Sequence, residues 1–528
     1  SLTKYLYHYL KLKLFSIISI VLVFLQFSCA KNQQSELKQF TIASGICNLL
    51  IEKKYEAAYS RIDDNFKVIN SLENFSENAA NFIGKSELIK KIKYKNITEN
   101  NTYLSFDCDI TTDKGTKKCN FVFSKNATLP INLNFSQSKK NKKTQLKKVK
   151  NDIYESEDFD LTKALSEPSL KDLCSDYFKL GFGIYGYNKQ TNSINLPEYM
   201  EVGKKHFNSC TLTNLMKPVY ILNEKKSRNN IKKGNDEPAL NFNIIEDTLK
   251  WCQENNVQMR GHTLVWHTQT PLWFFCEDYD STKNYVSRDV MIKRLDSFTK
   301  QYMDYVQTNF PGVVYCWDVV NEAVDPAKGD SSTDFLCRIE NDNTDNYWYY
   351  TIGNDYPEVA FTIARKYAAD GVKLFYNDYG TVDKRKRELI YNLCKSLKDK
   401  GLIDGVGMQG YWDVKNPSLA EIKNAIELYA SLGIEIQLTE WSIPAKEDSE
   451  RGFNEQAERY ASVFRLLKHL DTNGGGNANI TCVSFFGVMD GYTLYGNDKT
   501  NSRLFDKLLQ PKPVFYSIRD TFETWYGF

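Results

Sequence analysis

The chain has 528 residues, which exceeds the size of one ordinary domain and predicts two or three domains. Its formal net charge of +2 gives no overall electrostatic argument for binding nucleic acid or a membrane surface. The twelve cysteines are spread out, and none shows the CxxC spacing of a structural zinc site, so we expect no metal ion.

Residues 1–30 have the order of features that directs a protein to export. Three lysines precede an apolar run from Leu14 to Phe27, and small residues follow the run. This order predicts a secretory signal, with an uncleaved membrane anchor as the alternative, although the run is short for a spanning helix. The end of the run also loosely resembles a lipoprotein processing site with Cys29 as the lipidated residue. We therefore expect a secreted or cell-surface protein.

Residues 41–136 differ in pattern from the rest of the chain. Their first half has apolar residues at helical spacing, and their second half alternates polar and apolar residues, as in TYLSFDCDI. We predict a small α+β or mostly β accessory domain, whose role is either carbohydrate binding or that of a spacer. Cys108 and Cys119 flank its expected hairpin turn. They form either a disulfide with each other or two free buried thiols. Residues 137–167 carry a lysine-rich run and then an acidic run, which is typical of a solvated linker.

From residue 168 to residue 528, short apolar strands alternate with helical patterns. The strand candidates are FKLGFGIYG, HFNSCTLTN, QMRGHTLVWH, VVYCWDVVNE, KLFYNDYG, DGVGMQGYW, IEIQLTEW and ITCVSFFGVMD. This series predicts an α/β fold, a (β/α)8 barrel. Polar and aromatic residues gather at the C-terminal end of each strand, where barrel active sites form.

Two of these strands end in glutamate. VVYCWDVVNE delivers Asn321 and Glu322 at its tip, and IEIQLTEW delivers Glu440. For each glutamate alone, neutralisation by a nearby lysine or arginine is the alternative. Two carboxylates over one parallel barrel are what glycoside hydrolysis requires, one as proton donor and one as nucleophile or base.

Segments from most of these strands resemble glycoside hydrolase family 10, the endo-β-1,4-xylanases. They are RGHTLVWHTQTPLWF, WDVVNEAVD, YNDYG, GVGMQG, QLTEW and PKPVFYSI. The resemblance covers the chain from Ser169 to Phe528 and implies hydrolysis of the xylan backbone by double displacement, with no metal or organic cofactor. The expected partner is xylan or a related β-1,4-linked hemicellulose. We expect no nucleic acid partner, a monomer, and membrane contact only through an N-terminal anchor.

The resemblance assigns roles to the residues at the two strand tips. Glu322 would be the acid/base, which protonates the departing oxygen and then activates water. Glu440 would be the nucleophile that forms a covalent glycosyl-enzyme. Asn321 would hydrogen-bond the 2-hydroxyl of the sugar.

Two further segments resemble the walls of the family's sugar sites. On the third strand, His262, Trp266 and Gln269 would line the sugar beside the cleavage point. The alternatives are core packing for Trp266 and a structural hydrogen bond for His262. On the second strand, Asn214 and Lys217 would bind the next sugar.

The second strand also departs from the family pattern. The family usually has Glu where this chain has Thr213. Loss of a charge-assisted hydrogen bond costs about 1.5–3 kcal/mol. We therefore expect weaker binding of the distal sugar.

The side of the nucleophile departs further from the family pattern. Gln409 matches a contact to substrate and nucleophile, but Tyr411 stands where the family usually has His, and Ser442 where it often has Asp. The tyrosine hydroxyl can still donate to Glu440 without a counter-charge. We expect activity to survive with a shifted pH profile.

On the eighth strand, Phe486 and Leu494 stand where the family usually has two tryptophans that help exclude a hydroxymethyl group. The smaller side chains leave room, so we expect better tolerance of glucosyl or aryl-glycoside substrates. Two alternative functions stay open, namely a related glycanase acting on mixed-linkage glucan or xylo-oligosaccharides, and a carbohydrate-binding protein that has lost catalysis. Retention of both glutamates argues against the second, because a pure binder needs no carboxylate pair.

Overall fold

The computed structural model describes two compact units of the chain, one within residues 42–137 and one within residues 159–523. The first is described apart from residues 44, 48, 51–52, 64–66, 68–70, 84–88, 100–102, 113–114, 125–129 and 131. The second is described apart from residues 190, 342–343 and 491–500. The expected signal or anchor at residues 1–30, with Cys29, therefore lies outside the described residues.

The N-terminal unit is an α+β fold. Its sheet has the antiparallel order β1-β2-β3-β4, with strands Ile89–Glu99, Tyr103–Thr112, Gly115–Ser124 and Asn132–Gln137. Helices α3 (Tyr55–Ser60) and α5 (Leu72–Ile83) precede the sheet, and buried side chains from the helical half join those of β2 and β3 in one core. The segment with the alternating pattern forms the sheet, and the segment with helical spacing forms helices. Of the two predicted classes, α+β and mostly β, the unit is therefore α+β.

The thiols of Cys108 and Cys119 are both free and buried. The two residues face each other across the β2–β3 hairpin. The sulfur of Cys108 lies 3.5 Å from that of Cys47, in the helical half. Of the two expected states, the structure has free thiols.

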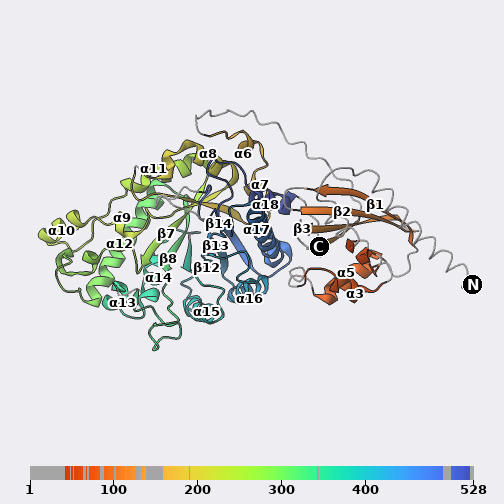
Figure 1. The fold of residues 1–528 in the computed structure, drawn as a ribbon. Coiled ribbons are helices and arrows are strands. Elements are labelled where there is room, and N and C mark those ends of the chain that lie inside the picture. Colours follow the sequence, from red (N-terminus) through yellow and green to blue (C-terminus); the bar gives the residue numbers. More distant parts are fainter. Residues whose placement is uncertain are drawn as a thin grey trace, which may run out of the picture. The chain divides into compact units, whose positions relative to one another are not determined.

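The second unit is a closed barrel of eight parallel strands in the order β5-β6-β7-β8-β11-β12-β13-β14, which confirms the predicted fold (Figure 1). Seven of the expected strand segments contain one strand each, and the eighth strand begins one residue before its expected segment. The strands are Lys179–Ile184, Ser209–Leu212, Gln258–Trp266, Val314–Asn321, Lys373–Asp378, Gly405–Met408, Glu435–Trp441 and Asn479–Phe485. They read as apolar runs rather than alternating patterns because both faces of a barrel strand are buried.

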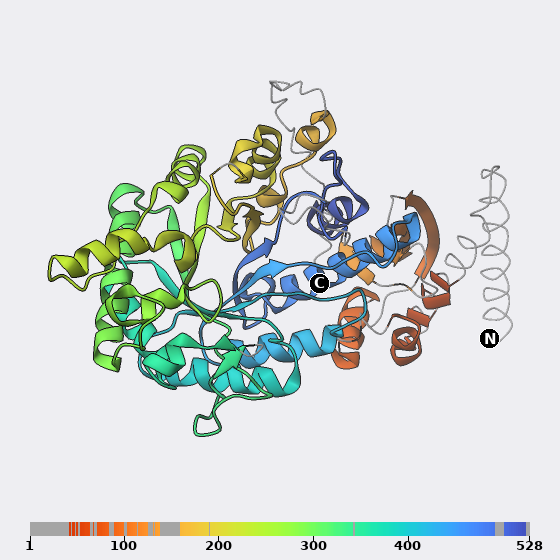
Figure 2. The ribbon, with the colours of Figure 1, turned by 60° about the vertical axis from the view of Figure 1, so that its left-hand side comes forward.

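Helices surround the strands on the outside of the barrel (Figure 2). The longer ones are α8 (Pro197–His206), α10 (Glu224–Lys232), α11 (Asn243–Asn255), α12 (Arg288–Asn309), α14 (Tyr356–Tyr367), α15 (Lys384–Asp399), α16 (Leu419–Ala430), α17 (Glu450–Leu470) and α18 (Pro513–Glu523). Short helices are α7 (Leu170–Leu173), α9 (Pro218–Ile221) and α13 (Tyr347–Thr351), and β9 (Glu340–Asn341) pairs with β10 (Thr344–Asp345). Local sequence fixes several starts, as in α16, where Ser418 and Glu421 form a capping box.

The end of the segment expected to be a linker is folded. Helix α6 (Thr162–Ser166) buries Ala164, whose carbonyl oxygen lies 2.8 Å from the imidazole Nε2 of His206. Burial lowers the pKa of His206 to about 3, so the ring is neutral there. The barrel unit therefore begins upstream of the expected boundary at residue 168.

The core beneath the barrel mouth depends on a close approach of β7 and β8. The indole of Trp317 is fully buried and packs edge-on to Tyr302 of α12, with ring centroids 5.0 Å apart. A Cβ at Gly261 would lie 2.4 Å from the Trp317 ring, so only glycine fits beside this indole. This packing supports the strand that carries His262 and the strand whose end directly precedes Glu322.

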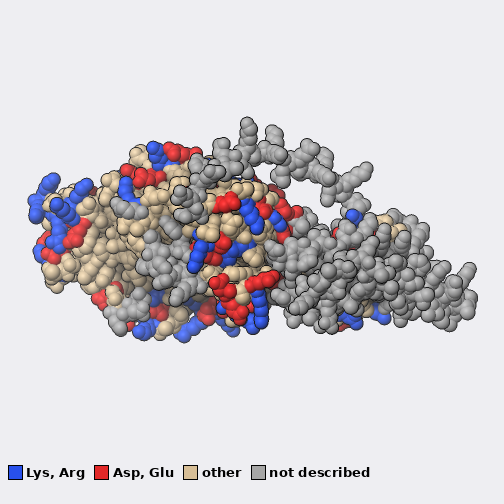
Figure 3. All heavy atoms as spheres, turned by 45° about the horizontal axis from the view of Figure 1, so that its top comes forward, with Lys and Arg blue, Asp and Glu red and all other residues tan. Residues whose placement is uncertain are grey.

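On the face of the molecule drawn in Figure 3, acidic and basic side chains of the barrel unit are interspersed. This agrees with the small net charge of the chain. Within the described ranges, no helix has the length and apolarity needed to cross a membrane.

Candidate active site

The two strand-end glutamates meet at the C-terminal mouth of the barrel, although β11 and β12 separate their strands. Asn377, at the end of β11, bridges the gap. Its amide nitrogen lies 2.9 Å from the amide oxygen of Asn321 and 3.2 Å from Oε1 of Glu440. Its own oxygen accepts a hydrogen bond from the hydroxyl of Thr439 at 2.6 Å.

Glu322 is partly exposed and is held by one donor at the end of β7 and one that directly follows β12. The indole Nε1 of Trp266 donates to Oε2 at 2.9 Å, and the amide Nε2 of Gln409 donates to Oε1 at 2.8 Å. Glu322 adopts a left-handed backbone conformation with φ of 57°. A non-glycine residue in this region is uncommon and typical of functional sites.

Glu440 is almost fully buried, with 7% of its surface exposed. The hydroxyl of Tyr411 donates to its Oε2 at 2.5 Å, which confirms the predicted contact. The Nε2 atom of His262 lies 3.9 Å from Oε1. Burial raises the pKa of Glu440, and the neighbouring Glu322 raises it further, while His262, Tyr411 and Lys217 act in the opposite direction.

Tyr411 combines an exposed ring with a buried hydroxyl. Its residue surface is 52% exposed, yet the oxygen lies against Glu440. Desolvation of the hydroxyl, followed by the charge of Glu440, raises the pKa of Tyr411 well above its ordinary value. The hydroxyl therefore stays protonated and acts as a neutral donor.

Below these carboxylates lies a buried charged group that the strands share. Arg260 donates two hydrogen bonds to the two oxygens of Asp318, at 2.8 and 2.6 Å, and Asp318 also lies 2.8 Å from Nδ1 of His262. Burial acts to raise the pKa of Asp318, but Arg260 and His262 outweigh it and lower the pKa. A charged Asp318 thus orients the imidazole toward Glu440.

The residues expected to bind the next sugar lie beside those expected to line the sugar at the cleavage point. The ammonium of Lys217 donates to Oδ1 of Asn214 at 3.1 Å and to Oε1 of Gln269 at 2.7 Å, and it lies 4.7 Å from the ring centre of Trp266. Burial lowers the pKa of Lys217 to about 8, against the effect of the two glutamates. The hydroxyl of Thr213 donates to the carbonyl of Ile184 at 3.4 Å.

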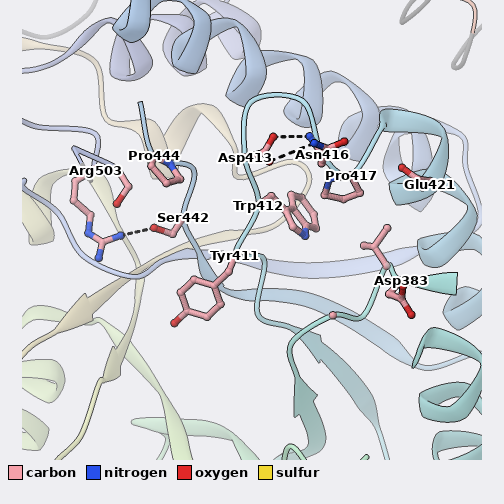
Figure 4. A pocket seen from close by; sticks show the side chains of 13 residues that line it. Asp383, Tyr411, Trp412, Asp413, Asn416, Pro417, Glu421, Ser442, Pro444 and Arg503 are labelled. Atoms are coloured by element: carbon pink, nitrogen blue, oxygen red, sulfur yellow. Dashed lines mark hydrogen bonds between the residues drawn. The ribbon is translucent and has the colours of Figure 1, made fainter. Parts of the chain in front are cut away.

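The nucleophile side opens into a pocket of about 900 Å3 (Figure 4). Tyr411 and Ser442 form part of its lining, and Ser442 accepts a hydrogen bond from Arg503 at 2.9 Å. Figure 4 shows Arg503 and Ser442 on one side, Asp383 and Glu421 on the other, and Trp412 between them. Ser442, which stands where the family often has Asp, thus contacts Arg503.

Of the two expected tryptophan replacements, the structure describes one. Phe486 is partly exposed, and its ring meets that of Tyr411 edge-on at 6.2 Å between centroids. The ring of Tyr185 also meets that of Phe486 edge-on, at the same centroid distance. Leu494 lies outside the described residues.

Sequence analysis does not single out three residues that shape this site. Asn377 lies in the quoted segment YNDYG, where a polar residue at a strand tip is the available signal. Asp318 is an acid within an apolar run, which also marks a buried partner. No local pattern marks Arg503, because only the fold brings it to Ser442.

The family model for glycosyl hydrolase family 10 matches residues 169–521. The chain belongs to this family. Endo-1,4-beta-xylanase B of Butyrivibrio fibrisolvens is 39% identical over 323 residues, which cover 61% of this chain and 48% of that relative. A protein of Caldicellulosiruptor saccharolyticus is 42% identical over 319 residues, 59% of this chain and 98% of the relative. The chain thus spans nearly all of one relative and about half of the other.

Solved structures agree with this family 10 assignment. The CBM22-1 and GH10 modules of endo-1,4-beta-D-xylanase 10B from Clostridium thermocellum, complexed with xylohexaose, align with a TM-score of 0.61 at 32% identity, covering 67% of each chain. A xylanase from Paenibacillus barcinonensis, complexed with a conduramine derivative, aligns with a TM-score of 0.55 at 32% identity. It covers 67% of this chain and 98% of that one.

The contact between Tyr411 and Glu440 predicts a pH effect in this family 10 chain. Because the tyrosine hydroxyl lowers the pKa of Glu440, Tyr411→Phe should raise that pKa and move the acidic limb of the kcat/KM profile to higher pH. Loss of a hydrogen bond to a charged group is worth about 1.5–3 kcal/mol, so kcat/KM near the optimum should fall roughly tenfold to a hundredfold. An unchanged acidic limb would show that the hydroxyl does not stabilise the ionised nucleophile.

Proposed function

We propose that this chain is a retaining endo-β-1,4-xylanase that hydrolyses the xylan backbone by double displacement. The observation that carries the proposal is the contact of both glutamates with Asn377, whose backbone carbonyl accepts from the nitrogen of Glu322 at 2.9 Å and whose amide donates to Oε1 of Glu440 at 3.2 Å. Membership of family 10 and the names of the relatives support the same reaction.

The first half of the reaction follows from the different surroundings of the two carboxylates. Glu440 attacks the anomeric carbon, and the bond from that carbon to the glycosidic oxygen breaks as Glu322 transfers its proton to that oxygen. Glu440 must be ionised for this attack, and Tyr411 and Asn377 donate to its oxygens. The product of this half is a covalent glycosyl-enzyme and a shortened xylan chain.

The second half reverses the roles of Glu322. It takes a proton from water, and the resulting oxygen attacks the anomeric carbon and releases Glu440. Trp266 and Gln409 hold the Glu322 carboxylate throughout, since both donate to it. One water molecule is consumed for each bond cleaved, and the configuration at the anomeric carbon is retained.

Trapping of the covalent intermediate tests this proposal. Incubation with a 2-fluoro xylobioside bearing a good leaving group should add one disaccharide to the peptide that contains Glu440, as seen by mass spectrometry of a digest. Glu440→Gln should show no label and should lose roughly a thousandfold or more of its activity on xylan. Intact sugar binding without any label on the native chain would instead favour a carbohydrate-binding protein.

One observation favours a broader substrate range. Phe486, which replaces a tryptophan of the family pattern, lies beside Tyr411 at the nucleophile side of the site. If this replacement leaves room for a hydroxymethyl group, the ratio of kcat/KM for aryl cellobioside to aryl xylobioside should rise above that of a typical family xylanase. Phe486→Trp should lower the ratio, and a native ratio as low as in such an enzyme would contradict the idea.

We also propose that the enzyme acts outside the cytoplasm. The support is the basic and then apolar order of residues 1–30, with Cys29 after the apolar run. Expression of the whole chain in a bacterial host, followed by fractionation and labelling with palmitate, should show export and, for a lipoprotein, label that Cys29→Ser abolishes. Cytoplasmic protein with an intact N-terminal segment would overturn export.

A further inference from the structure

The chain departs from regular strand geometry at Glu322. Strand β8 ends at Asn321, and Glu322 turns the chain away with φ of 57°. A bulky residue in this conformation persists only where its surroundings fix it. The backbone nitrogen of Glu322 donates to the carbonyl of Asn377, in β11, at 2.9 Å.

Beyond that point, two side chains bind the peptide group between Glu322 and Ala323. The Nε atom of Arg338 donates to the carbonyl oxygen of Glu322 at 2.9 Å. The nitrogen of Ala323 donates to the hydroxyl of Tyr376 at 3.0 Å. Both polar groups of one peptide are therefore held by side chains from separate segments of the chain, on opposite edges of the peptide plane.

The tyrosine is itself anchored. Its hydroxyl donates to Oδ2 of Asp378 at 2.5 Å, and Oδ1 of Asp378 accepts from the ammonium of Lys386 at 2.8 Å. Tyr376, Asp378 and Lys386 are all buried. Burial raises the pKa of Asp378 to about 6, with Lys386 opposing and the charge of Glu322 adding to the rise, which places this group within electrostatic reach of Glu322.

The arginine is anchored as well. Its NH2 atom donates to the carbonyl of Val324 at 3.2 Å and to the hydroxyl of Tyr379 at 3.0 Å. Its own backbone nitrogen donates to the carbonyl of Ala323 at 2.7 Å. Arg338 is 5% exposed, so water competes little for these bonds.

We propose that Tyr376 and Arg338 are positioning residues for the acid/base, which clamp the Glu322–Ala323 peptide and thereby aim the proton of Glu322 at the glycosidic oxygen. The proposal rests on the function proposed above for Glu322. Tyr376 is fully buried, and its hydroxyl contacts the peptide nitrogen of Ala323 rather than the carboxyl group of Glu322. A small displacement of a catalytic group can lower the reaction rate by a large factor, so loss of either hydrogen bond to this peptide should slow proton transfer.

Leaving-group dependence separates the aim of the acid from general damage to the site. A 2,4-dinitrophenyl group departs without protonation, whereas a phenyl group needs a proton from Glu322. For Tyr376→Phe, kcat/KM on phenyl xylobioside should fall roughly tenfold or more, while kcat/KM on 2,4-dinitrophenyl xylobioside should change by less than about twofold. Equal losses on both substrates, or no loss on either, would overturn the proposal.

Two reference variants make the result specific. Tyr429→Phe removes another fully buried hydroxyl, one that donates to the carbonyl of Thr381 at 2.7 Å, and should leave the ratio of the two substrates unchanged. Glu322→Ala should show the full leaving-group dependence. If Glu322→Ala shows no leaving-group dependence, Glu322 is not the acid and the proposed function fails. If Glu322→Ala shows the dependence and Tyr376→Phe does not, only the positioning role of Tyr376 and Arg338 is overturned.

A second variant covers the case in which Tyr376→Phe does not fold. Arg338→Lys keeps the positive charge but cannot hold the carbonyls of Glu322 and Val324 together. It should show the same selective loss on phenyl xylobioside. An unchanged ratio in this variant would also overturn the proposal.

Discussion

A buried guanidinium ties together the strands on which the site is built. Arg260, 1% exposed inside the barrel, donates to both oxygens of Asp318 and, at 2.6 Å, to Oε1 of Gln437. These residues belong to β7, β8 and β13, and each of those strands also carries a residue of the candidate site at or next to its C-terminal end. Removal of one partner from a buried ion pair costs about 3–5 kcal/mol, because the remaining charge is left without compensation. Loss of one of these partners, or a shift of one strand against the others, would therefore leave a buried charge without compensation.

The two carboxylates above this group are controlled in different ways. Glu440 is surrounded, and its charge is regulated by burial, by the imidazole of His262 and by the hydroxyl of Tyr411. Glu322 is partly exposed, and its orientation is controlled by donors to its carboxyl oxygens and by a hydrogen bond to its peptide carbonyl. The difference suits a nucleophile that must keep its charge and an acid that must exchange a proton with substrate and water.

The barrel and the two glutamates could be predicted from the sequence, because apolar runs indicate barrel strands and a charged residue at the end of such a run is unusual. The sequence was not sufficient for the bridge between them. That Asn377 reaches both sides depends on β11 and β12 lying between β8 and β13, which is a property of the closed barrel. Arg503 reaches Ser442 from a loop without any pattern of its own. Helix α6 was missed because it has five residues and follows a charged run, and its burial depends on His206.

The donors at Glu322 have a consequence for where its proton can reside. Indole Nε1 of Trp266 and amide Nε2 of Gln409 can only donate, and each occupies one lone pair, on Oε2 and on Oε1. A carboxyl group and a carboxylate both retain those two lone pairs, so neither neighbour has to rotate when Glu322 gains or loses its proton. The proton is confined to the lone pairs that remain. The charge state of the residue can thus alternate in every turnover while its hydrogen-bonded frame stays the same.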